Sequence, residues 1–184
     1  MTGRNLDSEP PGSSGRVDGR QGVGVAKVAW VDAGGALSSR ESSYLEGAAT
    51  RAAAELGVSG EVRVRIVGDA EMAWAHERYS GVAGTTDVLT FDLRDEGERA
   101  SSPMAMDVDI LVCVDEARRA AKLRGHQVEQ ELALYIVHGL LHCLGHDDHD
   151  ESAYERMHAA EDRVLETIGV GRVFGGPARE EGVN

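Results

Sequence analysis

The chain has 184 residues, of which 41% are hydrophobic and 28% charged, and its formal net charge is −13. This length and apolar content suffice for one globular domain with a modest core. The excess of carboxylates excludes a general nucleic-acid binder, because neutralising phosphates requires surplus lysine and arginine, so any RNA contact must be local. No apolar run approaches a membrane span, and the two cysteines fit a reducing compartment. We therefore expect a cytoplasmic protein with neither a membrane nor a small organic cofactor as partner.

The two ends of the chain differ in composition from its middle. Residues 1–22 are rich in glycine, serine and proline and contain few apolar side chains, and residues 173–184 are similar. Such segments cannot bury enough apolar surface to order themselves, so we predict disordered tails at both ends. Residues 23–172 form the predicted single domain.

Within this domain, apolar periodicity and capping residues predict alternating strands and helices. Residues 61–67 alternate strictly between valine or isoleucine and arginine, which is typical of a half-buried strand. Further strands are expected at 24–31, 86–92 and 107–114, and residues 94–104 are expected to form a surface loop. Helices are predicted at 38–56, 69–79, 115–123, 128–144 and 154–168, with Asp69, Asp115 and the pair Ser152 and Glu155 as N-terminal caps. This order predicts an α/β or α+β fold, with one mixed sheet of about four strands and helices packed on it.

The most informative stretch is 135–150, which reads YIVHGLLHCLGHDDHD and holds four of the seven histidines. The helix that contains its first half is apolar nearly all the way round, which indicates burial on most sides. His138 and His142 are four residues apart, so their imidazoles lie on one face of that helix. Two histidines one turn apart are a common way for a helix to bind a divalent metal. Gly145 can end the helix and let the chain turn back, bringing His146, Asp148 or His149 towards the same point.

Several stretches resemble one family. HGLLHCLGHDDH resembles the HGxLHLxGYDH signature of the YbeY family, metal-dependent endoribonucleases of ribosomal RNA maturation. TDVLTF at 86–91, VDILVC at 108–113 and the spacing of Met157, Glu161 and Leu165 also resemble that family, in its order. The resemblance implies a fold related to zinc metalloproteases with a central metal-binding helix and one zinc per chain. It also implies cleavage of single-stranded RNA near the 3′ end of 16S ribosomal RNA, with the small ribosomal subunit as partner.

The third metal ligand departs from the family pattern. The family places a histidine ten residues after the first ligand, and without a gap that position is Asp148 in this chain. Aspartate is a competent zinc ligand. The resemblance therefore assigns the metal and catalytic roles to His138, His142 and Asp148, and His149 becomes the third ligand if the turn contains a one-residue bulge.

A second departure concerns an arginine that the family often carries shortly before its TDVLSF strand and that is thought to serve RNA cleavage. Ser80 stands at that position here, and His76, one helical turn earlier, is a candidate substitute. Gly139 follows the first histidine, where a peptidase of the HExxH kind has its glutamate base, so peptide hydrolysis is not expected.

The helix before the metal helix carries the one basic cluster of the acidic domain. We predict RNA contacts from this cluster, Arg118, Arg119, Lys122 and Arg124. Asp109 stands on an otherwise apolar strand and needs a partner, either a ligand histidine or a helix terminus. The main functional hypothesis is an endoribonuclease of 16S ribosomal RNA maturation and ribosome quality control. The alternatives are a non-catalytic ribosome-assembly factor with a structural zinc and a zinc-dependent hydrolase of a substrate other than RNA.

Overall fold

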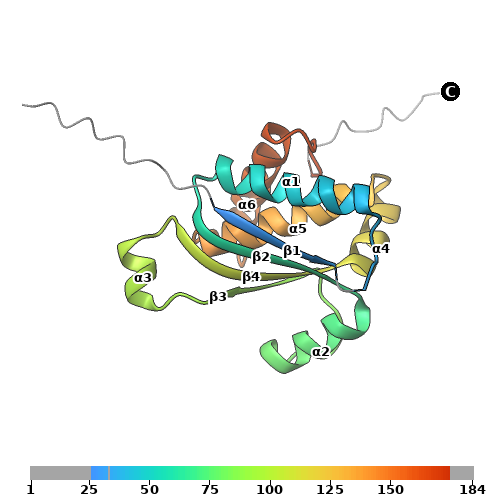
Figure 1. The fold of residues 1–184 in the computed structure, drawn as a ribbon, viewed down its shortest axis with the longest axis horizontal. Helices are drawn as coiled ribbons and strands as arrows, with labels where there is room; N and C mark the ends of the chain where they lie inside the picture. Colours follow the sequence, from blue (N-terminus) through green and yellow to red (C-terminus); the bar gives the residue numbers. More distant parts are fainter. Residues whose placement is uncertain (1–25, 33, 175–184) are drawn as a thin grey trace, which may run out of the picture.

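The computed structural model describes residues 26–32 and 34–174. Four strands form one sheet in the order β1-β2-β4-β3 (Figure 1). They are β1 (Lys27–Asp32), β2 (Ser59–Val67), β3 (Val88–Asp92) and β4 (Ala105–Cys113). β1, β2 and β4 are parallel, whereas β3 pairs with β4 in the antiparallel sense. The predicted mixed α+β sheet is therefore confirmed.

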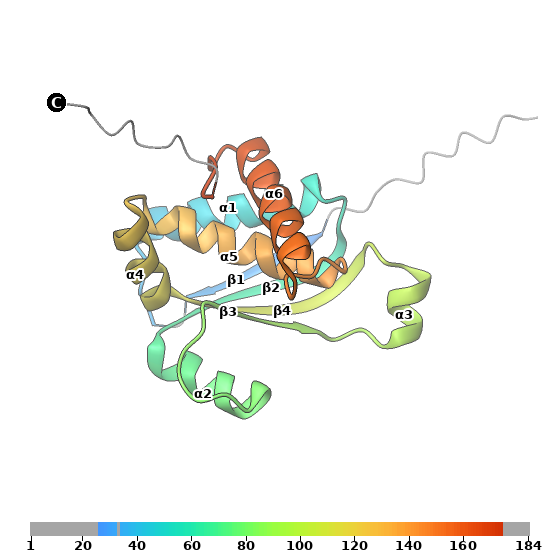
Figure 2. The same ribbon diagram turned by 180° about the vertical axis from the view of Figure 1, so that it is seen from behind.

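Helices cover the two faces of this sheet unequally. α1 and α5 pack on one face, α6 lies on the far side of α5, and α2 lies alone on the opposite face (Figures 1 and 2). The helices are α1 (Ser39–Glu55), α2 (Asp69–Ser80), α3 (Glu96–Ser101), α4 (Val114–Arg124), α5 (Val128–Cys143) and α6 (Glu151–Thr167). None of the helices in the described part of the chain is long and apolar enough to cross a membrane.

The alternation in β2 explains this asymmetry. Val62, Val64 and Ile66 are buried and belong to the main core, together with apolar residues of α1 and α5. Arg63 and Arg65 point to the opposite face, where they form ion pairs with carboxylates. A strand with one apolar and one charged face can bury only the first, so the core forms beneath α1 and α5.

The predicted surface loop at 94–104 contains a short helix. α3 begins after Asp95, which accepts a hydrogen bond from the Glu98 backbone while the Glu98 side chain accepts one from the Asp95 backbone. This reciprocal cap offsets the cost of starting a helix of six residues. None of the helix residues is buried, so the surface location was correct for 96–101 but not for Arg94, which is buried.

Three predicted helix caps were wrong. α6 begins three residues earlier than expected, and its cap is Asp150, which accepts from the Ala153 backbone at 2.7 Å, rather than Ser152. Asp115 does not cap its own helix α4; its carboxylate accepts the backbone N–H of Asp69 at 3.0 Å and so caps α2. Asp69 is the first residue of α2, and its carboxylate binds Arg119 instead. The first turns of α2 and α4 therefore stabilise each other.

The predicted N-terminal tail lies outside the described residues, as do residues 24 and 25 of the predicted first strand. Most of the predicted C-terminal tail lies outside them too, but its first two residues contact the domain. The backbone N–H groups of Val173 and Phe174 donate to Asp162 at 2.9 and 3.1 Å. The last described contacts therefore extend two residues beyond the predicted boundary at 172.

Candidate metal centre

α5 is the central helix of the structure and carries the histidine pair. Ten of its 16 residues are buried, because α1, α6 and the sheet surround it. It ends as predicted at Gly145, whose φ of +87° is readily adopted only by glycine. The N–H of His146 donates to the Leu141 carbonyl at 3.0 Å, which completes this C-terminal cap and turns the chain back.

The imidazoles of His138 and His142 face each other, with their Nε2 atoms 2.8 Å apart. The Nδ1 of His138 lies 2.6 Å from the Glu161 carboxylate, and the Nδ1 of His142 lies 3.0 Å from the His146 carbonyl oxygen. An ionised carboxylate and a carbonyl only accept hydrogen bonds, so both Nδ1 atoms must carry the proton. In neutral rings both Nε2 atoms then present lone pairs to each other. Their repulsion is relieved by a shared proton or by a bound metal ion, and two nitrogen donors beside a carboxylate form a donor set that fits a divalent metal.

Asp148 lies beside this pair. Its Oδ2 is 3.9 Å from the Nε2 of His138 and 3.8 Å from that of His142, and one donor atom from each residue lies within 4.8 Å of the others. His149 is 87% exposed and its Nδ1 approaches Asp147 and Asp148 rather than the histidine pair. His146 contributes its backbone carbonyl to the site. The structure thus brings His138, His142 and Asp148 together and places His149 at the surface.

Glu161 supports the first histidine from α6, a role that the sequence reasoning did not assign. Its side chain is fully buried, and its carboxylate holds the proton on Nδ1 of His138. Burial opposes charging of His138, but the hydrogen bond and the negative charge of Glu161 outweigh it, so the pKa of His138 is raised. A signal for this residue existed, because Glu161 interrupts the apolar stripe of α6 between Met157 and Leu165. A carboxylate on a core-facing stripe requires a buried partner.

The donor cluster opens into a cavity of about 500 Å³. Its walls come from the start of β3, from α4, α5 and α6, and from the C-terminal segment; they include Thr85, Thr86, Asp87, Arg124, Tyr135, Tyr154, His158 and Phe174. Burial raises the pKa of the Tyr135 hydroxyl far above its usual range, so it stays protonated at neutral pH. The cavity therefore combines donor atoms with aromatic and hydroxyl groups.

Gly139 brings α5 into close contact with the sheet. A Cβ atom built on Gly139 would lie 2.6 Å from Oγ1 of Thr90 and 3.4 Å from Cγ2 of Ile110. The first distance is well below van der Waals contact, so a larger residue fits only if the Thr90 side chain moves. The glutamate of an HExxH peptidase is absent, and Thr90 restricts the space for one.

The end of α5 is anchored by Arg94, which is 7% exposed. It pairs with Asp92 at 2.7 Å and donates to the carbonyl oxygens of Ala105 and Cys143. The Cys143 thiol itself is partly buried, and burial raises its pKa to about 11, so it is protonated at neutral pH and is a poor metal ligand.

The basic cluster predicted to contact RNA is largely neutralised by carboxylates. Arg118 pairs with Asp115, Arg119 with Asp69 and Glu116, and Arg124 with Glu131. Lys122 is exposed and has no ion pair with any described residue. Of the four, only Arg124 lines the metal cavity.

The remaining candidate residues lie away from the donor cluster. His76 binds the Gly84 carbonyl oxygen at 3.0 Å, and Ser80 is exposed at the end of α2. Asp109 forms an ion pair with Arg63 on the face of the sheet opposite α1 and α5. It therefore neither supports a ligand histidine nor caps a helix. Both expectations for Asp109 were wrong, because the nearest cation lies on the adjacent strand.

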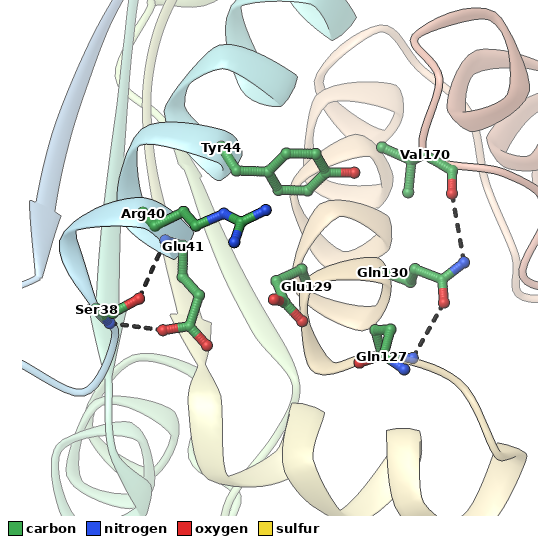
Figure 3. Close-up of a pocket in the computed structure, with 8 residues that line it drawn as sticks. All are labelled: Ser38, Arg40, Glu41, Tyr44, Gln127, Glu129, Gln130 and Val170. Carbon is green, nitrogen blue, oxygen red and sulfur yellow. Dashed lines mark hydrogen bonds between the residues drawn. The ribbon is translucent and has the colours of Figure 1, made fainter.

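A larger pocket, of about 730 Å³, lies between the N-terminal ends of α1 and α5 (Figure 3). Several of its polar groups serve the ends of these helices: Ser38 and Glu41 form a capping box, and Gln130 binds the Gln127 backbone and the Val170 carbonyl oxygen. It has no histidine or cysteine in its lining, so it offers a metal only oxygen donors.

The mixed sheet, the buried central helix and the converging histidines define a class of α+β proteins with a candidate metal site on the central helix. The chain belongs within this class to the endoribonuclease YbeY family, whose family model matches residues 37–169. The membership inferred from the separate motifs is confirmed.

Individual relatives agree with this assignment. An endoribonuclease YbeY of Bacillus licheniformis is 36% identical over 128 residues, which cover 66% of this chain and 81% of that protein. Another, of Shouchella clausii, is 32% identical and covers 77% of this chain and 94% of its own length. The solution structure of TM1509 from Thermotoga maritima shares the fold, with a TM-score of 0.50 and 24% identity over 77% of this chain and 91% of that one.

Proposed function

We propose that this chain is a metal-dependent endoribonuclease of ribosomal RNA processing, with one zinc ion held by His138, His142 and Asp148. The observation that carries the proposal is the pair of Nε2 atoms 2.8 Å apart whose Nδ1 atoms both donate elsewhere. Family membership supports the reaction, since the relatives in Bacillus licheniformis and Shouchella clausii are both endoribonucleases YbeY.

The residues of the chain divide the work at this site. His138 and His142 supply neutral nitrogen donors because Glu161 and the His146 carbonyl oxygen keep their protons on Nδ1. Asp148 adds a carboxylate, which reduces the net positive charge of the centre relative to three imidazoles. A bound divalent ion supplies Lewis acidity to a phosphoryl oxygen and increases the acidity of water. RNA also brings its own nucleophile, the 2′-hydroxyl, so the absence of a glutamate at Gly139 does not prevent cleavage.

The substrate proposed is single-stranded RNA near the 3′ end of 16S ribosomal RNA, within the small ribosomal subunit in the cytoplasm, with a role in ribosome quality control. Arg124 lines the cavity beside the donor cluster and is paired with Glu131. Arg118 and Arg119, on the same helix, are paired with carboxylates too, which agrees with a local RNA contact on an acidic domain. Lys122 is the second proposed phosphate contact.

Cleavage of a defined single-stranded RNA by the purified full chain tests this function. Cleavage should require metal, should stop on addition of a chelator and return with zinc, and should be lost in His142→Ala. Metal-free cleavage, or equal activity in His142→Ala, would contradict the proposal. Stoichiometric metal binding without cleavage of any ribosomal RNA fragment would favour the non-catalytic assembly factor.

The third ligand is tested by a matched pair of neighbouring variants. Asp148→Ala should weaken zinc affinity by orders of magnitude, whereas His149→Ala, which alters an exposed side chain, should change it less than about threefold. Competition with a chromophoric chelator measures both. The reverse result would mean that the turn after Gly145 rearranges when metal binds.

A further inference from the structure

Glu161 receives hydrogen bonds from two histidines, and only one of them belongs to the donor cluster. Its Oε1 lies 2.6 Å from Nδ1 of His138, and its Oε2 lies 2.5 Å from Nδ1 of His158. The carboxylate is fully buried, and among the described residues no lysine or arginine forms an ion pair with it. Both oxygens of a buried carboxylate need donors, so the two imidazoles together determine its orientation.

His158 is held on both sides by aromatic rings. Phe174 stacks on it with 3.7 Å between ring centroids and 27° between the ring planes, and Tyr154 contacts it edge-on at 3.9 Å. Arg124 lies over the Phe174 ring, 5.2 Å from its centroid. The Nε2 of His158 is buried and has no hydrogen-bond partner among the described residues. Within the described part of the chain, the bond to Glu161 is therefore the one polar contact of this packed ring.

We propose that His158 is a positioning residue of the metal centre, which holds the Glu161 carboxylate in the orientation that keeps the proton of His138 on Nδ1. This inference rests on the metal centre proposed above. Without a donor on Oε2, the carboxylate could rotate to find one, and its bond to His138 would weaken. A His138 that is free to carry its proton on Nε2 presents no lone pair to a metal. The stack with Phe174 extends this support to the C-terminal segment of the chain.

Two substitutions of His158 distinguish the effect of its Nδ1–H donor from the effect of its aromatic ring. His158→Phe keeps an aromatic ring between Tyr154 and Phe174 but removes the donor. His158→Asn loses the ring but places an amide N–H close to where Nδ1 was. The range for groups that contact a metal ligand directly is about 10- to 100-fold, and His158 acts one contact further out, so we expect His158→Phe to weaken zinc affinity by up to roughly tenfold and His158→Asn to restore most of it.

His126→Phe is the matched control. His126 also bonds a fully buried glutamate, Glu131, but it lies at the other end of α5 and touches none of the donor residues. Because Glu131 keeps its pair with Arg124, this variant should lower the melting temperature by no more than His158→Phe does, and it should leave zinc affinity within about twofold of the wild type. The comparison therefore separates loss of stability from loss of positioning.

Three measurements on the full chain decide the outcome: zinc affinity by chelator competition, thermal unfolding of the metal-free protein, and the tautomer of His138 from ¹⁵N chemical shifts. The His138 Nδ1–H tautomer should persist in His158→Asn and be lost in His158→Phe. Unchanged zinc affinity and tautomer in a folded His158→Phe would overturn the inference, as would equal losses in the Phe and Asn variants. If the wild-type chain bound no zinc, the failure would instead be that of the proposed metal centre.

Discussion

Glu131 lies in the first turn of α5 and Glu161 lies on α6. Both are fully buried, since neither side chain is exposed to solvent. Both accept a hydrogen bond from a histidine, His126 and His138 respectively. They differ in their other partner. Glu131 also binds Arg124, which donates to both of its oxygens, whereas Glu161 binds His158 and, among the described residues, no arginine.

Their partners indicate different roles for the two glutamates. Glu131 stabilises the fold, whereas Glu161 supports a histidine of the proposed metal site. A carboxylate paired with arginine is neutralised under all ordinary conditions and serves to connect α4 with α5. In the proposed arrangement, the Glu161 carboxylate, which lies between two imidazoles, keeps the proton of His138 on Nδ1. His138 in turn lines the cavity beside the donor cluster. Burial alone would have suggested the same role for both residues, so the identity of the partners is what separates them.

The largest expected effect is that of metal removal on stability. With free zinc at about 1,000 times its dissociation constant, binding should stabilise the wild-type protein by about 4 kcal/mol, and a chelator should abolish this increment. Urea unfolding with and without chelator measures it. Glu131→Gln should gain the same unfolding free energy from zinc as the wild type does. A smaller gain in that variant would contradict the view that Glu131 supports the fold and not the metal site.

The next effect is on metal affinity itself. Glu161→Gln should weaken zinc binding by about 10- to 100-fold, since the amide that replaces the carboxylate holds the Nδ1 proton of His138 less firmly. Glu131→Gln should leave zinc affinity unchanged and cost about 1–3 kcal/mol of unfolding free energy through its weakened pair with Arg124. Chelator competition and urea unfolding of the two metal-free variants give both quantities. Equal loss of zinc affinity in the two variants would show that the two glutamates are not distinct.

The smallest effect is on stability in acid, and it extends the contrast to Asp92, a partly buried carboxylate. The hydrogen bonds and charge of Arg94 hold the pKa of Asp92 below its usual range despite this partial burial. A lowered folded-state pKa stabilises the fold at pH above the ordinary carboxyl value of about 3.9, and this contribution is lost as pH falls through the lowered value. In the metal-free protein, Arg94→Met should therefore flatten the loss of stability below about pH 4. Unfolding followed from pH 5 to pH 2 measures this slope, and an unchanged slope would contradict the role given to the pair.

The parts of the structure that were predictable from sequence are those that depend on neighbours along the chain. α5, its histidine pair and its end at Gly145 follow from a stretch that is apolar nearly all the way round and from one residue able to adopt positive φ. The strand β2 follows from strict alternation. The family signature then narrowed the third metal ligand to Asp148 or His149, because it fixes the number of residues between the first ligand and the third. Apolar periodicity alone does not specify that number.

Partners that are distant in sequence could not be predicted in this way. Glu161 is 23 positions from His138 and on another helix. Arg63 meets Asp109 only because β2 and β4 are neighbours in register. The capping of α2 by Asp115 likewise depends on how two helices meet, so a correct residue type was assigned to the wrong helix. Local patterns identify which side chains need a partner, and the topology of the sheet decides which partner each one receives.

The close approach of Gly139 to Thr90 also limits how this site could change its chemistry. A glutamate after the first histidine would create the peptidase motif in one substitution, yet even its Cβ atom would lie 2.6 Å from the Thr90 hydroxyl oxygen. A second change, in the side chain of Thr90, would be needed to make room on β3 for the first. The packing of one helix on one strand thus couples position 139 to position 90, so that the two residues are expected to change together.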